Sequence, residues 1–203
     1  MIEEHWLLPI LGQAPTGLLA FDIGANDGEW TRLLSGRHSH VVAVEPDERA
    51  FHHLRGCVRD CDLAINAAAF SSDGNVELFV RPNSVQSSLL EVHPIGAGGQ
   101  ADAPVVSVRS VSAVTLDSLA KLAFERWGGS RVDFVKIDVE GAEAEVLAGA
   151  TSQAFRGTRW LIEIHDRLQE VAAQLHRLGF ETVQAVAHPS PSAHPRHFWI
   201  YCE

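Results

Sequence analysis

Residues able to do chemistry gather first in the stretch FDIGANDGEWT, residues 21–31. Asp22 ends an apolar run typical of a buried strand, and Gly24 and Gly28 leave the backbone bare where a ligand would touch it. A carboxylate at this position repels phosphate, and the glycine spacing is not the G-x-G-x-x-G of a pyrophosphate turn. The turn therefore predicts a binding site for a ligand that carries positive charge or hydrogen-bond donors.

A second acid stands at the end of the next apolar run, HVVAVEP. Glu45 follows Asp22 by 23 residues, and an acid about 20 residues beyond a glycine turn typically accepts hydrogen bonds from ribose hydroxyls. A ribose acceptor next to a phosphate-free site for a cationic group fits S-adenosylmethionine (SAM), which has a ribose, a sulfonium and an amino acid. The two acids therefore indicate a SAM site.

Polar side chains also lie inside and at the ends of two later apolar runs. Strand alternation puts Lys136 and Asp138 on one face of the first run, and Glu163 and His165 on one face of the second. Unpaired buried charge is expensive, so we expect Lys136 to pair with Glu163 if the two strands are neighbours.

The candidates for catalysis are Asp138, His165 and Glu140. Methyl transfer from the sulfonium of SAM needs a nucleophile aligned with the methyl group and, where that nucleophile is a hydroxyl, a group that takes away its proton. Each candidate also has a structural interpretation. Asp138 could cap the next helix, Glu140 could be an acid favoured by the helix dipole, and His165 could be a core histidine.

A metal centre is a further interpretation of the same residues. Asp138, Glu140, Glu163 and His165 offer the oxygen-rich ligands that Mg²⁺ or Mn²⁺ prefers. Lys136 would oppose a cation there. A divalent metal is therefore not favoured, and no metal ligand is assigned.

These residues are positioned by apolar runs that alternate with helical patterns. Near-continuous apolar strands separated by helices predict a parallel sheet covered on both faces. Two segments, 76–80 and 105–111, alternate like a smaller antiparallel element, and Asp47 can cap a helix. The other predicted strands are 17–23, 40–46, 63–70, 131–139, 159–165, 181–187 and 197–202. The predicted helices are 29–34, 47–55, 115–127, 142–150 and 166–180.

Composition limits the class of protein. With 203 residues, 46% of them hydrophobic, we expect a single domain over 1–203, with a small insertion at about 71–113. The net charge of −10 and the scattered arginines argue against nucleic acid as a partner. No apolar run approaches the roughly 20 residues of a membrane span, and the acidic start is unlike a secretory signal. We expect a cytoplasmic protein that does not bind membranes.

The chain resembles the FkbM-type SAM-dependent methyltransferases over about residues 18–166. The motifs that carry the resemblance are, in chain order, FDIGANDGEWT, VVAVEPDERAF, NAAAFSSDGNVELFV, VTLDSL and VDFVKIDVEGAEAEVLAGA. The resemblance implies a Rossmann-like α/β fold. Its mostly parallel sheet would have seven strands with helices on both faces and an antiparallel last strand. It also implies O-methylation of a small molecule or a sugar-containing natural product.

The resemblance also implies roles for particular residues. Ser87 and Ser88 could donate hydrogen bonds to the substrate or cofactor, or could be exposed hydroxyls at a strand edge. The SAM-binding positions would be Asp22, Gly24, Ala25, Asn26, Gly28, Glu45, Pro46, Asn66, Ala67 and Asp138.

Only about 17 residues precede the first predicted strand, whereas the family often has a longer segment there. The cover over the substrate could therefore be small or supplied by a partner chain, which makes a homodimer plausible. Two other functions stay open: an NAD-dependent oxidoreductase on a similar sheet, and a non-catalytic SAM-binding or interaction domain.

Overall fold

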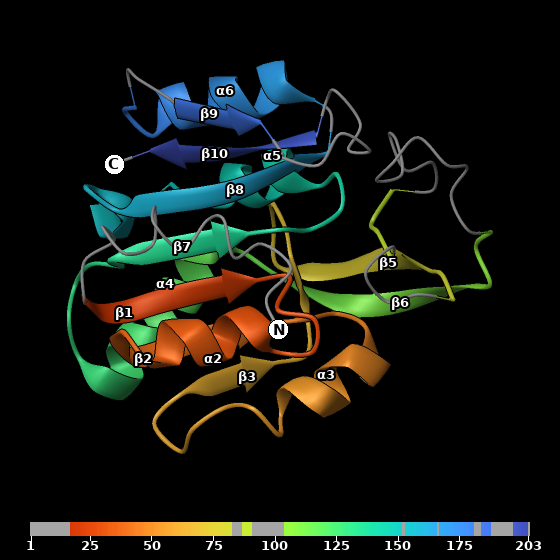
Figure 1. The fold of residues 1–203 in the computed structure, drawn as a ribbon, viewed down its shortest axis with the longest axis horizontal. Helices are drawn as coiled ribbons and strands as arrows, with labels where there is room; N and C mark the ends of the chain where they lie inside the picture. The colour runs from red at the N-terminus through yellow and green to blue at the C-terminus, as the bar shows by residue number, and fades with distance from the viewer. Residues whose placement is uncertain are drawn as a thin grey trace.

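A seven-stranded sheet forms the centre of the computed structural model, with strand order β3-β2-β1-β7-β8-β10-β9 (Figure 1). The structure describes residues 17–82, 87–90, 104–151, 153–165, 167–180, 184–187 and 197–202. The strands are β1 (Gly17–Ile23), β2 (His38–Val44), β3 (Leu63–Ile65), β7 (Phe134–Ile137), β8 (Arg159–His165), β9 (Gln184–Ala187) and β10 (His197–Cys202). Strands β3, β2, β1, β7 and β8 pair in parallel, and β10 is antiparallel to both of its neighbours. The predicted sheet with an antiparallel last strand is confirmed.

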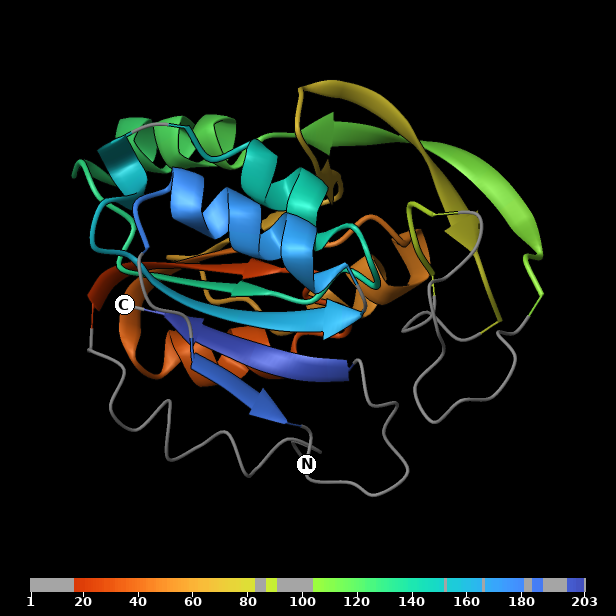
Figure 2. The ribbon, with the colours of Figure 1, turned by 90° about the horizontal axis from the view of Figure 1, so that it is seen from above.

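Helices cover both faces of this sheet (Figure 2). On one face lie α4, α5 and α6, where Leu119, Val146 and Val171 join the main hydrophobic core. On the other face lie α2 and α3, where Trp30 and Leu34 of α2 belong to a second buried cluster. The helices are α2 (Glu29–Ser35), α3 (Glu48–Leu54), α4 (Leu116–Trp127), α5 (Glu143–Ala148) and α6 (Leu168–Arg177), with a 3₁₀ turn, η3 (Gln153–Phe155). No helix in the described part of the chain is long and apolar enough to cross a membrane.

A smaller sheet of three strands, in the order β4-β6-β5, stands beyond the arrowheads of β1 and β7 (Figure 1). Strands β5 (Gly74–Val80) and β6 (Ser107–Val114) pair antiparallel, as their alternation predicted, and β4 (Ala68–Ala69) adds in parallel to β6. Because the parallel strands end here, the smaller sheet forms one wall of any site at their carboxyl ends.

The prediction of one strand over 63–70 was wrong. The segment divides into β3, which pairs with β2, and β4, which pairs with β6 in the smaller sheet. Between them the Asn66 side chain donates hydrogen bonds to the carbonyl oxygens of Glu45 and Pro46, at 2.8 and 3.2 Å. These side-chain bonds take the place of a continued ladder and turn the chain out of the main sheet.

Two local bonding patterns set element boundaries. Asp47 caps α3 as predicted, because its carboxylate accepts from the N–H groups of Arg49 and Ala50. Strand β7 begins three residues later than the predicted 131. At Asp133 the carboxylate accepts from the N–H groups of Leu18 and Leu19 at 2.8 and 3.0 Å, which ties this residue to the start of β1.

Candidate functional site

A pocket opens at the carboxyl ends of β1, β2 and β7, facing the smaller sheet. The main sheet supplies its polar lining through the turns that follow these three strands, and the smaller sheet and the residues beside it supply a largely apolar wall. The lining residues are Gly24, Asn26, Val44, Glu45, Pro46, Ala68, Ala69, Leu78, Ser87, Ser88, Leu89, Asp138, Val139 and Glu140. This is the edge of an α/β sheet at which ligands bind.

The two predicted glycines have different surroundings. Gly24 lines the pocket with φ +74°, and a Cβ there would lie 1.7 Å from the carbonyl oxygen of Asp138. Gly28, with φ +88°, lies outside the lining, and its Cβ would come within 2.9 Å of the Cβ of Cys57. Both glycines are therefore needed for close packing of the chain, and only Gly24 also faces the pocket.

Asp22 is fully buried behind the pocket wall. Its Oδ2 accepts a hydrogen bond from the hydroxyl of Thr31 at 2.6 Å, and its Oδ1 lies 3.7 Å from Nζ of Lys136. Burial raises the pKa of Asp22, although the ammonium and the hydroxyl partly offset this effect. These contacts brace the glycine turn against α2 and β7, and a direct contact with a cofactor stays a prediction.

Glu45 forms a fixed carboxylate on the pocket wall. Its Oε2 accepts from the N–H of Asn26 at 2.9 Å, and its Oε1 accepts from the N–H of Asp47 at 2.7 Å. Burial raises the pKa of Glu45 to about 7, against the lowering effect of these two hydrogen bonds. Each oxygen keeps a second lone pair with which to accept from a ligand.

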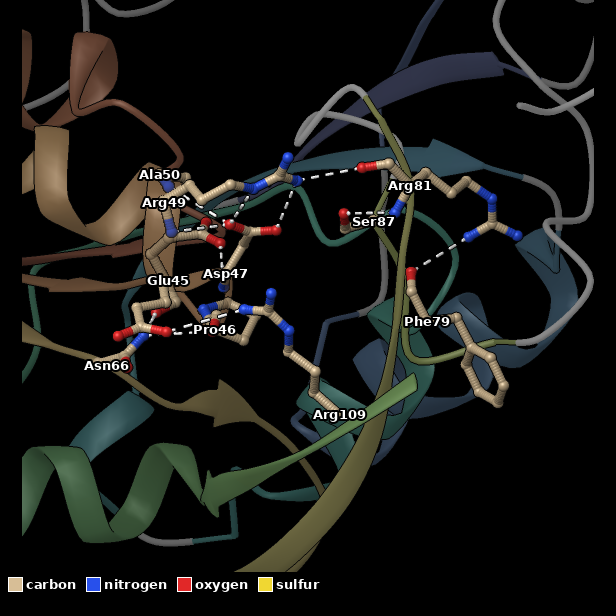
Figure 3. A network of polar contacts seen from close by, with 11 residues as sticks. Glu45, Pro46, Asp47, Arg49, Ala50, Asn66, Phe79, Arg81, Ser87 and Arg109 are labelled. Atoms are coloured by element: carbon tan, nitrogen blue, oxygen red, sulfur yellow. Dashed lines mark hydrogen bonds and ion pairs between the residues drawn. The ribbon is translucent and has the colours of Figure 1, made fainter. Parts of the chain in front are cut away.

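A polar network joins this part of the wall to the smaller sheet (Figure 3). The Arg49 guanidinium lies 3.2 Å from the Asp47 carboxylate and donates to the carbonyl oxygen of Arg81 at 3.1 Å. A longer ion pair of 3.7 Å links Arg109 of β6 to Glu48 of α3. The network ties the start of α3 directly to the smaller sheet.

The other predicted cofactor residues lie around this wall. Pro46 lines the pocket directly, while Asn66 holds the backbone of Glu45 and Pro46 from behind (Figure 3). Ala67 is buried in the main core, and Ala25 packs in the small cluster beneath α3. Asn66, Ala67 and Ala25 are absent from the lining, so they shape the pocket through its backbone and packing.

Lys136 neutralises acids on both sides of the β1–β7 pair. It lies directly opposite Asp22 in the strand register, and its Nζ is 3.2 Å from Oδ2 of Asp138 and 3.2 Å from the carbonyl oxygen of Gly24. On the other side its register partner is Leu161, which places Glu163 two residues further along β8. Pairing with Glu163 stays a prediction, and the contact with Asp22 is one that the sequence reasoning missed.

His165 lies within a group of carboxylates at the end of β8. Its Nδ1 is 2.9 Å from Oε1 of Glu143, while its Nε2 is 3.5 Å from Oε2 of Glu140 and 3.9 Å from Oε1 of Glu163. Burial alone would lower the pKa of His165, but these three glutamates raise it well above its ordinary value.

Asp138 differs from His165 in its proton affinity. Burial alone would raise the pKa of Asp138, but Lys136 and His165 lower it overall. Asp138 is therefore a stable anion at neutral pH and a weak proton acceptor, whereas His165 binds a proton readily. Of the predicted catalytic residues, Asp138 and Glu140 line the pocket and His165 stands behind them.

The residues of the alternative metal interpretation are only partly brought together. Ligand atoms of Asp138, Glu163 and His165 lie within 4.8 Å of one another, and Glu140 is 3.5 Å from the His165 ring. The Lys136 ammonium next to Asp138 supplies positive charge at this point already.

The partners of the two serines, and the presence of Glu143 in the site, were not predictable from the sequence. Ser88 is buried, and its hydroxyl donates to the carbonyl oxygen of Glu140 at 2.7 Å, while the Ser87 hydroxyl accepts from the N–H of Arg81 at 3.2 Å. Glu143 was not predicted as a site residue. Its only sequence signal is its position three residues after Glu140, in the same EGAE turn.

The fold and the pocket together define a class of protein. A parallel sheet with an antiparallel last strand, helices on both faces and a pocket at the carboxyl ends is the Rossmann-like fold of methyltransferases. The model of the methyltransferase FkbM domain matches residues 22–182, so the chain belongs to the FkbM methyltransferase family. No curated protein matches the chain by sequence comparison.

Solved structures share the fold at low sequence identity. The methyltransferase FkbM from Methylobacillus flagellatus KT is 15% identical with a TM-score of 0.58, and the match covers 93% of this chain and 44% of that one. The chain thus spans less than half the length of that protein. A SAM-dependent methyltransferase from Leishmania major is 9% identical with a TM-score of 0.52, covering 96% and 69% of the two chains.

A third structure shows that the fold alone does not determine the reaction. Precorrin 8w decarboxylase from Methanobacterium thermoautotrophicum is 15% identical with a TM-score of 0.51, and the match covers 100% of this chain and 90% of that one. The particular reaction must therefore be argued from the residues of the pocket.

Proposed function

We propose that this methyltransferase uses SAM to methylate a hydroxyl of a small molecule or a sugar-containing natural product. The observation that carries the proposal is the charge of the pocket lining. Three carboxylates line it, from Glu45, Asp138 and Glu140, and there is no lysine or arginine among the described lining residues. Such a lining disfavours a pyrophosphate, which needs positive charge or N–H donors, and suits a cofactor with a ribose and a cationic centre.

The chemistry of the lining fits SAM. The Glu45 carboxylate, fixed by two backbone N–H groups, would accept from the ribose hydroxyls, with Pro46 beside it. Ala68, Ala69 and Leu78 offer an apolar surface to an adenine ring, and Gly24, Asn26 and Asp138 lie at the polar end. When bound, SAM supplies a methyl group on a positively charged sulfur, which an oxygen nucleophile can attack.

The same carboxylates favour an acceptor without negative charge. Asp138 and Glu140 lie at the polar end of the pocket, with Glu163 close behind. Like charges in a poorly solvated site repel, so an acceptor with a phosphate or carboxylate near its reacting atom is disfavoured. A neutral hydroxyl suits this end, where the alignment of acceptor and methyl group supplies much of the rate.

Calorimetric titration with SAM tests the proposal. We expect wild-type protein to bind SAM with a Kd of micromolar order, and Glu45→Ala to weaken binding at least about tenfold, because one good hydrogen bond to a charged group contributes ~1.5–3 kcal/mol. Asp22→Ala should weaken it too, by loosening the turn that carries Gly24. Glu48→Ala is the matched control, since this glutamate is exposed and pairs only loosely with Arg109.

Two results would contradict the proposal. Folded wild-type protein that gives no heat with SAM or S-adenosylhomocysteine does not have the predicted cofactor site. Micromolar binding of NADH, measured by fluorescence, would instead support an oxidoreductase.

A further inference from the structure

Glu143 is a buried carboxylate that contacts a backbone N–H group and the ring of His165. It begins α5, is inaccessible to solvent, and accepts at Oε1 from both the N–H of Gly141 at 2.8 Å and Nδ1 of His165 at 2.9 Å. Its second oxygen, Oε2, has no hydrogen-bond partner among the described residues. A buried carboxylate with one unsatisfied oxygen lowers stability, and a role in the site would account for that cost.

The contact with Glu143 determines which nitrogen of the neutral His165 ring carries the proton. An ionised carboxylate only accepts hydrogen bonds, so Nδ1 carries the proton and Nε2 is the basic nitrogen of the neutral ring. Nε2 is directed toward Glu140 at 3.5 Å and Glu163 at 3.9 Å. Glu140 lines the pocket, so the basic nitrogen faces a carboxylate of the pocket wall.

We propose that Glu143 is a positioning residue that fixes His165 with Nδ1 protonated, so that Nε2 receives the proton released by the acceptor hydroxyl. The inference rests on the proposed function and assigns the proton of that reaction to one atom. The acceptor oxygen forms a bond to the methyl carbon, and the carbon–sulfur bond breaks with its electron pair left on sulfur. The O–H bond breaks, and its proton passes to Nε2.

A metal ion is the competing explanation for the same geometry. Histidines that bind metals also donate their other ring N–H to a carboxylate, and Asp138 and Glu163 bring oxygens within 4.8 Å of His165. The Lys136 ammonium lies 3.2 Å from Oδ2 of Asp138, and a divalent cation at this carboxylate would meet its full repulsion. A proton, which changes the local charge by one unit, is the better fit.

The charges around His165 give the proposal a pH signature. The groups facing the ring are Glu140 from the turn after β7, Glu143 from α5 and Glu163 on its own strand. Asp138 at the end of β7 also interacts with it, and His197 lies opposite in the β10 register. The glutamates raise the pKa of His165, so the neutral base forms only above the ordinary range of histidine. Methyl transfer should therefore quicken as pH rises through this raised pKa.

NMR of the imidazole nitrogens of ¹⁵N-histidine-labelled protein tests, without any substrate, which ring nitrogen of His165 carries the proton. The His165 signals are identified by their loss in His165→Gln. We expect the neutral ring to carry its proton on Nδ1 and to titrate above the ordinary histidine range. In Glu143→Gln the titration should move down by roughly one unit or more, because an adjacent charge is removed.

Glu145→Gln is the matched control. Glu145 lies on the same helix two residues away but pairs with Arg167 at 2.8 Å, so the titration of His165 should stay unchanged. Glu143→Asp serves as a second variant if Glu143→Gln fails to fold, and should keep the Nδ1 proton. A proton on Nε2 of the neutral wild-type ring would overturn the proposal, as would an unaltered titration in folded Glu143→Gln.

Two further measurements separate the alternatives. With a panel of hydroxyl acceptors and methyl-labelled SAM, Glu143→Gln should lower kcat roughly 10²-fold with an acid limb at lower pH, while SAM affinity is retained. If the wild-type protein does not bind SAM, the proposed function is refuted. The NMR result would still show whether Glu143 fixes the protonation of His165. Broadening of the His165 signals by micromolar MnCl₂, or activity abolished by EDTA and restored by Mn²⁺, would replace the proton acceptor with a metal ligand.

Discussion

Glu140 combines a functional position with an unfavourable backbone. Its φ is +55°, a left-handed conformation that costs a residue with a side chain about 1–2 kcal/mol. The hydroxyl of Ser88 donates to its carbonyl oxygen at 2.7 Å and holds the turn in this shape. Backbone strain at a residue that lines the pocket suggests that the position of this carboxylate matters for function.

Replacing Glu140 should separate stability from activity. We expect Glu140→Gly to raise the free energy of unfolding by about 0.5–1 kcal/mol, because glycine adopts positive φ readily, and to lower methyl transfer roughly tenfold. Glu140→Gln keeps the strain and removes only the charge, so it should lose activity without the gain in stability. Urea unfolding and a methyl-transfer assay measure both effects, and a fall in stability in Glu140→Gly would show that the turn is not strained.

At the scale of elements, the turn after β1 packs against the end of β7, and the two segments together form one side of the pocket. The N–H groups of Gly24 and Ala25 donate to the carbonyl oxygen of Val44, and Lys136 on β7 bonds to the carbonyl oxygen of Gly24. Gly24 meets the Asp138 backbone at a distance that leaves no room for a side chain. One glycine thus determines how closely the turn after β1 approaches the turn after β7.

Gly24→Ala should therefore be severely destabilising. The added Cβ would lie 1.7 Å from the carbonyl oxygen of Asp138, so one of the two turns must move, at a cost of at least ~4 kcal/mol. Gly157 is the matched control, with φ +66° and nothing within 4 Å of an added Cβ, so Gly157→Ala should cost only the backbone term of about 1 kcal/mol. Chemical denaturation compares the two, and equal losses would mean that conformation alone, and not the contact, requires glycine at 24.

The elements themselves were largely predictable, and the side-chain partners were not. Apolar runs predicted β1, β2 and β8, and Asp47 predicted the start of α3. Both signals are visible in the sequence because they depend on residues that are close together along the chain. The division of 63–70 depended on Asn66 reaching the backbone of another segment. Likewise, the pairing of Lys136 with Asp22 required the order of strands, which local patterns do not contain.

At the scale of the whole molecule, buried ionisable groups make stability depend on pH in opposing ways. Burial raises the pKa of Glu45 and Asp22, and the neighbouring glutamates raise that of His165. These groups hold more protons in the folded than in the unfolded chain, so stability falls as pH rises through their raised pKa values. His38 acts in the opposite direction, because burial lowers its pKa and folding is then disfavoured as pH falls below its ordinary value of 6.5.

A difference measurement isolates the contribution of Glu45. Its pKa rises from 4.5 to about 7 on folding, so its stabilising effect is complete below 4.5 and is lost by the time pH passes 7. Between pH 5 and 8 the wild-type protein should lose about 2–3 kcal/mol more stability than Glu45→Gln, at about 1.4 kcal/mol for each pKa unit. The loss of one acceptor in the variant shifts its stability at every pH and leaves this difference intact.

Urea unfolding at four or more pH values measures the difference, with exposed Glu48→Gln as the control that should parallel wild type. Parallel curves for wild type and Glu45→Gln would show that the Glu45 carboxylate is not desolvated. If the curves diverge as expected, the proposed cofactor site contains an acid that folding alone leaves poorly stabilised as an anion. The hydroxyl donors of a ribose would then stabilise the Glu45 anion, so SAM should stabilise the protein more above pH 7 than below it. This added stabilisation should disappear in Glu45→Gln.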